Sequence, residues 1–420
     1  MSLKKNTLWS IAGGGAPALS ALISIPILVL YLGYEQFAIV SLLLSLTIFF
    51  YIYDFGVGRS MTYLLPQQRY RESASSNHLL FSAIYLAIVI GGLISAIAYF
   101  AASLFVTGWL RVSPEIEMTT INAFQILSIG ILPSILGTIL RGALEGFSEF
   151  KKANIGKIFS GASIFLAPAL LVIAGHTNFE SISMAILLTR IAALLLFIYL
   201  LLQVISLKFV RLSLTDTRCI FEYSKWAALG GFISTMFVYG DRFIVSRYLD
   251  SESLSVYIFS QDILIRFLLI PWAMAMVLMP IFAANQLSKE AFLGLYENQS
   301  MKVRNYSFLI AVSLILTVYY LLKIPTDVAV SEHVFDVVLI QTIGVFFCAM
   351  SQLPLIYLYA KGKPKAVSFI YLSEAALYIM IAPWVFSSFG LTGACLVWAG
   401  RQIIEYLLLQ IYAKRTMQCS

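Results

Sequence analysis

Hydrophobic residues in this chain fall into long continuous runs rather than into alternating or amphipathic patterns. A run of about 20 apolar residues can cross a hydrocarbon core of about 30 Å as an α-helix, because the helix rises about 1.5 Å per residue. We therefore predict an all-α, polytopic membrane protein with about twelve spans, at roughly residues 7–32, 36–57, 78–106, 118–140, 153–174, 181–207, 223–247, 253–284, 303–323, 332–360, 366–387 and 391–413.

The two halves of the chain repeat one another. At offsets of 217 or 215 positions the matched segments are TLWSIAGGG (7–15) with SKWAALGGF (224–232), YLGYE (31–35) with YLDSE (248–252), and APALLVIAGHT (167–177) with APWVFSSFGLT (382–392). Each half holds six predicted spans, so both begin on the same side of the membrane. The repeat predicts two six-helix lobes, 1–207 and 223–420, joined by a cytoplasmic linker, 208–222. A pseudo-two-fold axis along the membrane normal would relate the lobes, with a site at their interface near the midplane.

Composition supports a membrane protein, because 60% of the residues are hydrophobic and only 12% are charged. Of the 28 Lys and Arg residues, 21 fall in the segments on one side of the predicted spans and three on the other; four lie inside spans. This bias predicts that both termini of the multi-pass protein are cytoplasmic. The net charge of +7 is thus explained by topology, and no nucleic-acid partner is expected.

Catalytic and metal-binding chemistry finds no support in the sequence. The four Cys are far apart without a CxxC motif, and the three His are isolated, so no metal site or cofactor is expected. The loops are too short to hold a soluble active site, and we expect a transporter rather than an enzyme.

Three segments resemble the Wzx-type O-antigen and capsule flippases of the multidrug/oligosaccharidyl-lipid/polysaccharide exporter superfamily. They are YDFGVGRSMTYLLPQ (53–67), RGALEGFSEFKKANIGKI (141–158) and YGDRFIVSRYLD (239–250). The resemblance implies flipping of an undecaprenyl-diphosphate-linked sugar unit from the cytoplasmic to the periplasmic leaflet. It also implies contact with membrane lipids and with the polysaccharide polymerase and chain-length machinery as partners.

Charged residues inside the spans each need a physical reason, since a charge at the bilayer centre costs at least about 2.5–3.5 kcal/mol. The reason is either a structural ion pair or a polar lumen, and the two can coexist. Arginine offers a planar fork of donors suited to phosphate. The candidate residues for the head group and its diphosphate are therefore Arg190, Arg266, Arg401 and Arg242. The candidates for coupling to H⁺ or Na⁺ are the acids Asp262, Glu374, Glu405 and Asp241.

Two acid–arginine pairs among these candidates have the spacing that allows an ion pair along one helix. Asp262 and Arg266 stand at i and i+4, as do Arg401 and Glu405 in reversed order. In the alignment of the two halves, Ser45 matches Asp262 and Phe49 matches Arg266. The first lobe therefore has no charged pair at this position. Arg190 has no acid three or four residues away, and an interhelical pair with Asp54 or Glu374 is its structural alternative.

A further basic group is predicted at the cytoplasmic end. Asp54, Arg59, Arg141 and Lys225, with Glu145, form a candidate mouth for the anionic head group. Ordinary positive-inside anchoring and loop salt bridges are the favoured explanation of these residues.

Three alternatives remain open. A MATE-like drug or ion antiporter would favour acids in the cavity over Arg190. A membrane glycosyltransferase or O-antigen polymerase would need a sizeable external loop. A passive scramblase would need no coupling ion.

Overall fold

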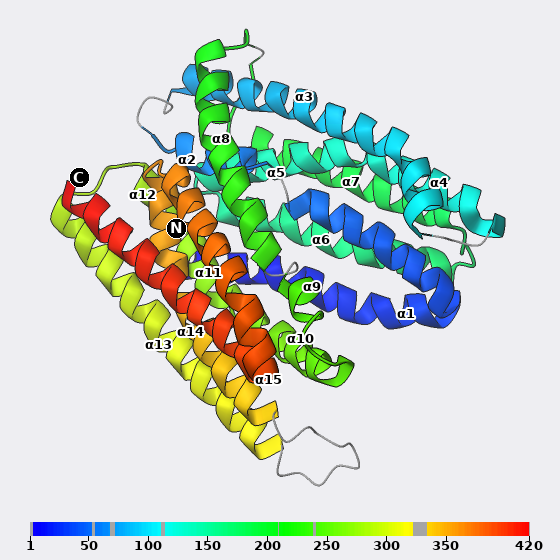
Figure 1. Cartoon of the computed structure of the whole chain (residues 1–420). Coiled ribbons are helices and arrows are strands. Elements are labelled where there is room, and N and C mark those ends of the chain that lie inside the picture. Colours follow the sequence, from blue (N-terminus) through cyan, green and yellow to red (C-terminus); the bar gives the residue numbers. More distant parts are fainter. Residues whose placement is uncertain are drawn as a thin grey trace. The chain divides into compact units, whose positions relative to one another are not determined.

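The computed structural model describes residues 3–52, 55–67, 72–110, 114–208, 210–237, 241–321 and 334–419. Within these ranges the chain is helical and contains no β-strand, which confirms the predicted all-α class (Figure 1). The chain divides into two compact units, Met1–Ala228 and Leu229–Ser420. The division falls inside α8 (Leu214–Thr235), a helix that begins within the predicted linker. The sequence-based lobes, with their symmetry axis, stay a prediction.

Within the described ranges, unit 1 is built from nine helical segments. They are α1 (Leu3–Ile52), α2 (Val57–Leu64), α3 (Ser73–Phe105), the π-helical turn η2 (Val106–Leu110), α4 (Pro114–Ile129), α5 (Ile131–Gly146), α6 (Phe150–Ile173), α7 (Phe179–Leu202) and α8 (Leu214–Thr235), which crosses into unit 2. The first two predicted spans form the single element α1. Gly33 is its non-helical residue, with φ 75°, a conformation open to glycine.

Glycines let the helices of unit 1 approach closely. A Cβ built on Gly142 of α5 would lie 2.1 Å from the carbonyl oxygen of Gly58 in α2. The Thr62 hydroxyl donates to the Gly142 carbonyl at 3.2 Å and adds a bond to this contact. Gly56 has φ 74°, and a Cβ there would lie 2.8 Å from Ala227 of α8. The glycines of segments 53–67 and 141–158 therefore serve helix packing.

The described residues of unit 2 form seven further helices. They are α9 (Asp241–Val245), α10 (Ser251–Arg266), α11 (Leu269–Met276), α12 (Met279–Ala283), α13 (Lys289–Leu321), α14 (Val334–Ala360) and α15 (Pro364–Cys419). α14 packs against α13, α15 and α10. The last two predicted spans are two arms of α15, which turns at Gly390 with φ 52°.

Prolines account for helix breaks that the apolar runs did not reveal. The predicted span 253–284 is divided into α10, α11 and α12, and the predicted span 118–140 into α4 and α5. Pro133, Pro271 and Pro280 lack the N–H that would bond the carbonyl four residues earlier, at Ile129, Phe267 and Met276. Each of these three residues lies at a break. Pro17 and Pro26, in contrast, lie inside α1 without ending it.

The repeat is reflected in corresponding backbone features. Gly175 and Gly390, which the repeat pairs, both have positive φ, at 90° and 52°. Each follows a helix with an internal proline, Pro168 in one case and Pro383 in the other. Both glycines open a turn between two neighbouring helices or arms.

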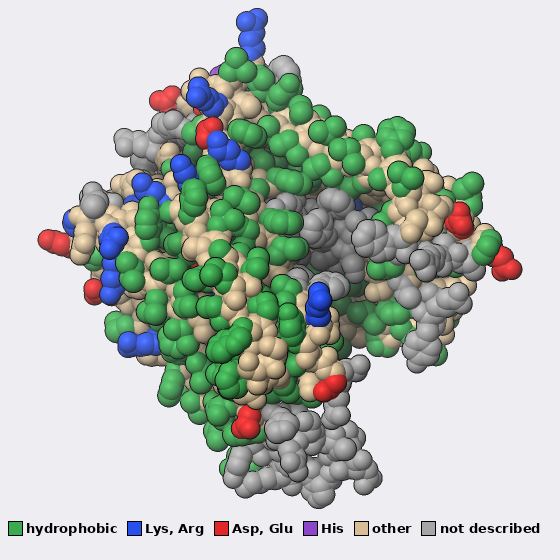
Figure 2. All heavy atoms as spheres, viewed as in Figure 1, with side chains coloured by type: hydrophobic (Ala, Val, Ile, Leu, Met, Phe, Trp, Pro, Cys, Tyr) green, Lys and Arg blue, Asp and Glu red, His purple; other side chains and the backbone are tan. Residues whose placement is uncertain are grey.

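The outer surface of each unit is apolar, whereas several charged residues are buried. Leu30, Phe100 and Met380 are 80%, 77% and 76% exposed, and hydrophobic side chains cover much of the face in Figure 2. In the described part of the chain, eight helices are long and apolar enough to cross a membrane. These features are those of a multi-pass membrane protein; the count of twelve spans stays a prediction.

Candidate functional site

A buried ion cluster joins the two arms of α15. Arg401 Nη1 lies 3.4 Å from Glu374 Oε2 on the first arm and 3.2 Å from Glu405 Oε2 on the second. All three residues are buried. The turn at Gly390 brings Glu374 opposite Arg401, while Glu405 stands one helical turn beyond Arg401. Two acids thus share one guanidinium.

The three ionic side chains have unequal surroundings. Glu405 Oε1 accepts hydrogen bonds from the hydroxyls of Ser351 and Tyr371, both at 3.4 Å. The Arg401 guanidinium carbon lies 4.1 Å from the centre of the Phe237 ring, within cation–π range. Glu374 Oε1, however, is buried and has no hydrogen-bond partner among the described residues. This oxygen is the atom of the cluster best placed to accept a proton or a cation.

Asp241, at the start of α9, adds a third buried acid to the same region of unit 2. Tyr257 donates to its Oδ2 at 2.6 Å, and Tyr378 of α15 donates to its Oδ1. The rings of Tyr378 and Phe237 pack edge to face with centroids 6.3 Å apart. Phe237 therefore contacts both Arg401 and a tyrosine that donates to Asp241. We name Asp241, Glu374, Arg401 and Glu405 the acid cluster.

A groove between the two arms of α15 leads to the acid cluster. Its volume is about 290 Å³, and its lining includes Glu374, Tyr378 and Arg401. The remaining lining is mostly aliphatic, and Leu377, Ile381, Leu396 and Ile404 of this lining are exposed. The ion pair is thus reached through an opening with an apolar rim.

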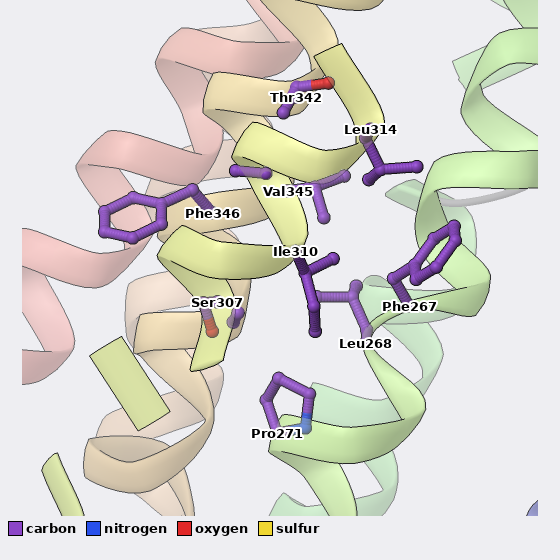
Figure 3. A pocket seen from close by; sticks show the side chains of 11 residues that line it. Phe267, Leu268, Pro271, Ser307, Ile310, Leu314, Thr342, Val345 and Phe346 are labelled. Atoms are coloured by element: carbon purple, nitrogen blue, oxygen red, sulfur yellow. The ribbon is translucent and has the colours of Figure 1, made fainter. Parts of the chain in front are cut away.

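The sequence-predicted pair in α10 has a different setting. Arg266 is the last residue of α10 and is exposed in its unit, while the side chain of Asp262 lies outside the described residues. Beyond Arg266, Phe267, Leu268 and Pro271 face Ile310 of α13 and Val345 of α14 across a small pocket of about 10 Å³ (Figure 3). This pocket is mainly apolar and contains no charged group.

Arg190 is buried in unit 1, on α7. Its Nη1 donates to the carbonyl oxygen of Ser160 on α6 at 3.4 Å. Its Cγ lies 4.0 Å from the position of a Cβ built on Gly130, which is van der Waals contact distance. Gly130 lies at the break between α4 and α5. Glu374 has Arg401 as its ion-pair partner. Arg190 thus has a position in the helix packing, and its role toward a diphosphate stays a proposal.

The residues of the predicted mouth are only partly grouped. Arg59 follows Gly58 and Arg141 precedes Gly142, so both flank the close contact of α2 with α5. Arg141 pairs with Glu145 at 3.8 Å and Lys225 with Glu222 at 2.6 Å, whereas Asp54 lies outside the described residues. Arg242 is half-buried next to Asp241 on α9.

The structure brings together Asp241, Glu374, Glu405 and Arg401, of which the sequence paired only Arg401 with Glu405. Sequence reasoning missed the tyrosines at positions 257, 371 and 378, because Tyr is frequent in this chain and its hydroxyls carry no spacing signal. No group of three or more His, Cys, Asp or Glu residues suited to a metal ion occurs among the described residues.

Comparison with known proteins adds two kinds of similarity. The sequence pattern of the polysaccharide biosynthesis protein family matches residues 3–286. Over 418 residues the chain is 27% identical to a Shigella flexneri protein named "Putative O-antigen transporter", covering 98% of this chain and 97% of that one.

Solved structures of MATE and related transporters share the fold. A MATE protein in a straight conformation superposes with a TM-score of 0.82 at 13% identity, over 99% of this chain and 96% of that one. A mutant of a Vibrio cholerae MATE transporter gives a TM-score of 0.82 at 12% identity, over 100% and 97%. A Pyrococcus furiosus transporter of the MOP superfamily, for which a binding pocket of reversed polarity is described, gives 0.76 at 13% identity, over 99% and 95%.

Proposed function

The chain belongs to the polysaccharide biosynthesis protein family, and we propose that it is a flippase for an undecaprenyl-diphosphate-linked oligosaccharide. The substrate is an O-antigen or capsule repeat unit, which moves from the cytoplasmic to the periplasmic leaflet of the bacterial inner membrane. The full-length similarity to a protein named as an O-antigen transporter carries this proposal. The protein moves its substrate without changing it chemically, and the polysaccharide polymerase and chain-length machinery use the product.

The acid cluster supports ion coupling. If its three carboxylates were all ionised, one guanidinium would leave a net charge of about −2 in a buried region of unit 2. Uncompensated buried charge is costly, so uptake of H⁺ or Na⁺ at this place is favourable. An ion that binds one conformation of a transporter better than the other shifts the population toward that conformation. We assign this role to Glu374, Asp241 and Glu405, with the side chain of Asp262 as a further candidate.

Recognition of the diphosphate falls to arginines in this proposal. Arg401 already contacts two carboxylates through its Nη1. Arg190 is buried and donates to the Ser160 carbonyl, and Arg266 is exposed in its unit. The candidates for contact with the head group are Arg190, Arg266, Arg401 and Arg242. The mouth residues Arg59, Arg141, Lys225 and Asp54 would meet the anionic head group first.

The function is tested in a bacterial strain that lacks its own O-antigen flippase. Expression of the chain is expected to restore polymerised O-antigen at the cell surface, detected with a specific antibody. In proteoliposomes, the matching assay follows a fluorescent polyprenyl-diphosphate sugar, with a membrane-impermeant quencher to report its leaflet. A chain that reaches the membrane but flips none of several repeat units in either assay contradicts the proposal.

The rival functions give different results in the same preparation. A MATE-like antiporter would export cationic dyes in exchange for H⁺ or Na⁺, and flipping would be absent. A glycosyltransferase or polymerase would change the mass of the labelled lipid. A scramblase would flip at the same rate in both directions whatever ion gradient is applied.

A further inference from the structure

Unit 2 contains a second cavity, which lies at the ends of several of its helices. It is formed where α12 ends, α13 begins, the chain turns from α14 into α15, and α15 approaches its carboxyl end. Its volume is about 460 Å³, which is within the range of small-molecule sites. Figure 1 places the C-terminus beside α12 at this end, and Figure 2 shows Lys and Arg side chains gathered there. We call it the lysine pocket.

Lys361 is the central cation of the lysine pocket. Its ammonium donates to Asn285 Oδ1 and lies 5.2 Å from the ring centre of Phe292 and 5.9 Å from that of Tyr357. Burial lowers the pKa of the Lys361 ammonium below its ordinary value. No carboxylate of the described residues lies within ion-pair distance of it. Its charge is therefore met by an amide oxygen and two ring faces alone.

Two further lysines line the pocket from separate segments. Lys289 is the first residue of α13, and Lys363 precedes Pro364 at the start of α15. Between Lys361 and Lys363, Gly362 has φ 67°, so the turn that presents both lysines requires a conformation that glycine adopts readily. Neither Lys289 nor Lys363 forms an ion pair with a carboxylate in the described part of the chain. Three cations thus converge without a carboxylate partner among the described residues.

We propose that the lysine pocket binds the phosphate group of an anionic lipid head group. Lysine ammoniums are compact donors that bind phosphate oxygens as point charges. The lining also includes Ile281, Leu287 and Leu293, which suit the glycerol and first methylene groups next to such a phosphate. The basic residues predict that this face is cytoplasmic, where anionic lipids attract clustered lysines. The site is separate from the acid cluster, because Glu374 lies 11 residues, or about 16 Å of helix, beyond Lys363.

The test uses the full chain in neutral detergent micelles. Thermal unfolding is followed while short-chain phosphatidylglycerol, short-chain phosphatidylcholine or inorganic pyrophosphate is titrated. We expect stabilisation by phosphatidylglycerol and an apparent affinity about tenfold weaker in Lys363→Gln, with a larger loss in Lys361→Met/Lys363→Gln, because each lost charged contact is worth about a factor of ten. Lys363 is exposed, so its substitution leaves folding intact.

Lys414→Gln is the matched control, since Lys414 is an exposed lysine of α15 near the same end that does not line the pocket. Equal weakening in Lys414→Gln, or equal binding of phosphatidylcholine, overturns the proposal. Lysine-dependent binding of pyrophosphate as tight as that of phosphatidylglycerol keeps phosphate recognition but overturns the lipid as its source. None of these readouts measures transport, so they are independent of the proposed flipping.

Discussion

Glu374 and Arg401 form a buried ion pair with a nitrogen–oxygen distance of 3.4 Å between the two arms of α15. They are 27 positions apart in sequence, and the turn at Gly390 makes them neighbours. Glu405 contacts the same guanidinium nitrogen, Arg401 Nη1, at 3.2 Å. The geometry gives each member a distinct expected effect when it is replaced.

Replacing Glu374 with Gln is expected to uncouple transport from the ion gradient while leaving the fold intact. The amide keeps the shape and hydrogen-bonding capacity of the acid but cannot bind a proton or cation in the same way. Gradient-driven flipping should fall by about 5- to 150-fold, the range of typical coupling energies. It is measured in proteoliposomes with an imposed pH or Na⁺ gradient. Glu297→Gln, an exposed position on α13, is the control. Unchanged gradient dependence in Glu374→Gln would show that another acid carries the coupling.

Replacing Arg401 with Gln is expected to damage stability first. It leaves Glu374 and Glu405 buried without an opposite charge, at a cost of about 3–5 kcal/mol. The melting temperature in detergent should fall strongly in Arg401→Gln and little in Arg304→Gln, an exposed arginine of α13. The double variant Glu374→Gln/Arg401→Gln should recover part of the loss, since one unpaired charge is gone. A double variant less stable than Arg401→Gln would contradict this account of the cluster.

Replacing Gly390 with Ala is expected to destabilise unit 2. The backbone there has φ 52° and ψ −131°, where a side chain introduces strain of about 1–3 kcal/mol. Gly231→Ala is the control, because a Cβ there meets nothing within 4 Å and no positive φ is recorded for it. Thermal melting compares the two. Equal melting temperatures would mean that the turn tolerates an ordinary residue.

Replacing Gly142 with Ala is expected to push α5 away from α2. The added Cβ would lie 2.1 Å from a backbone oxygen of Gly58, which cannot rotate aside as a side chain can. Overpacking of this kind costs about 1–3 kcal/mol. Gly92→Ala in α3, with open space around the new Cβ, serves for comparison. Equal expression and stability of both variants would argue that the two helices have room to separate.

The sequence predicts the helices well because their signal is local. A run of 20 or more apolar residues has few other structural outcomes, and the all-α membrane class follows from it. The helix breaks at Pro133, Pro271 and Pro280 had a local signal too, but Pro17 and Pro26 carry the same residue type within an unbroken α1. Proline alone therefore does not locate a break.

The acid cluster could be predicted only in part. Arg401 and Glu405 are one helical turn apart, so their pairing is visible in the sequence. The partner of Glu374 depends on how the chain turns at Gly390. The partners of Asp241 come from 16 and 137 positions away, on α10 and α15. Such contacts are set by packing between helices, which leaves no periodic trace in the chain.

The turn at Gly390 also bears on how the protein enters the membrane during synthesis. The first arm of α15 delivers Glu374 before Arg401 has been made, and a lone carboxylate in the bilayer costs at least about 2.5 kcal/mol. The arrival of the second arm supplies the missing guanidinium. The cost of burying Glu374 is therefore lowest if the two arms insert together as one hairpin. The ion pair thus couples membrane insertion of the last span to that of the span before it.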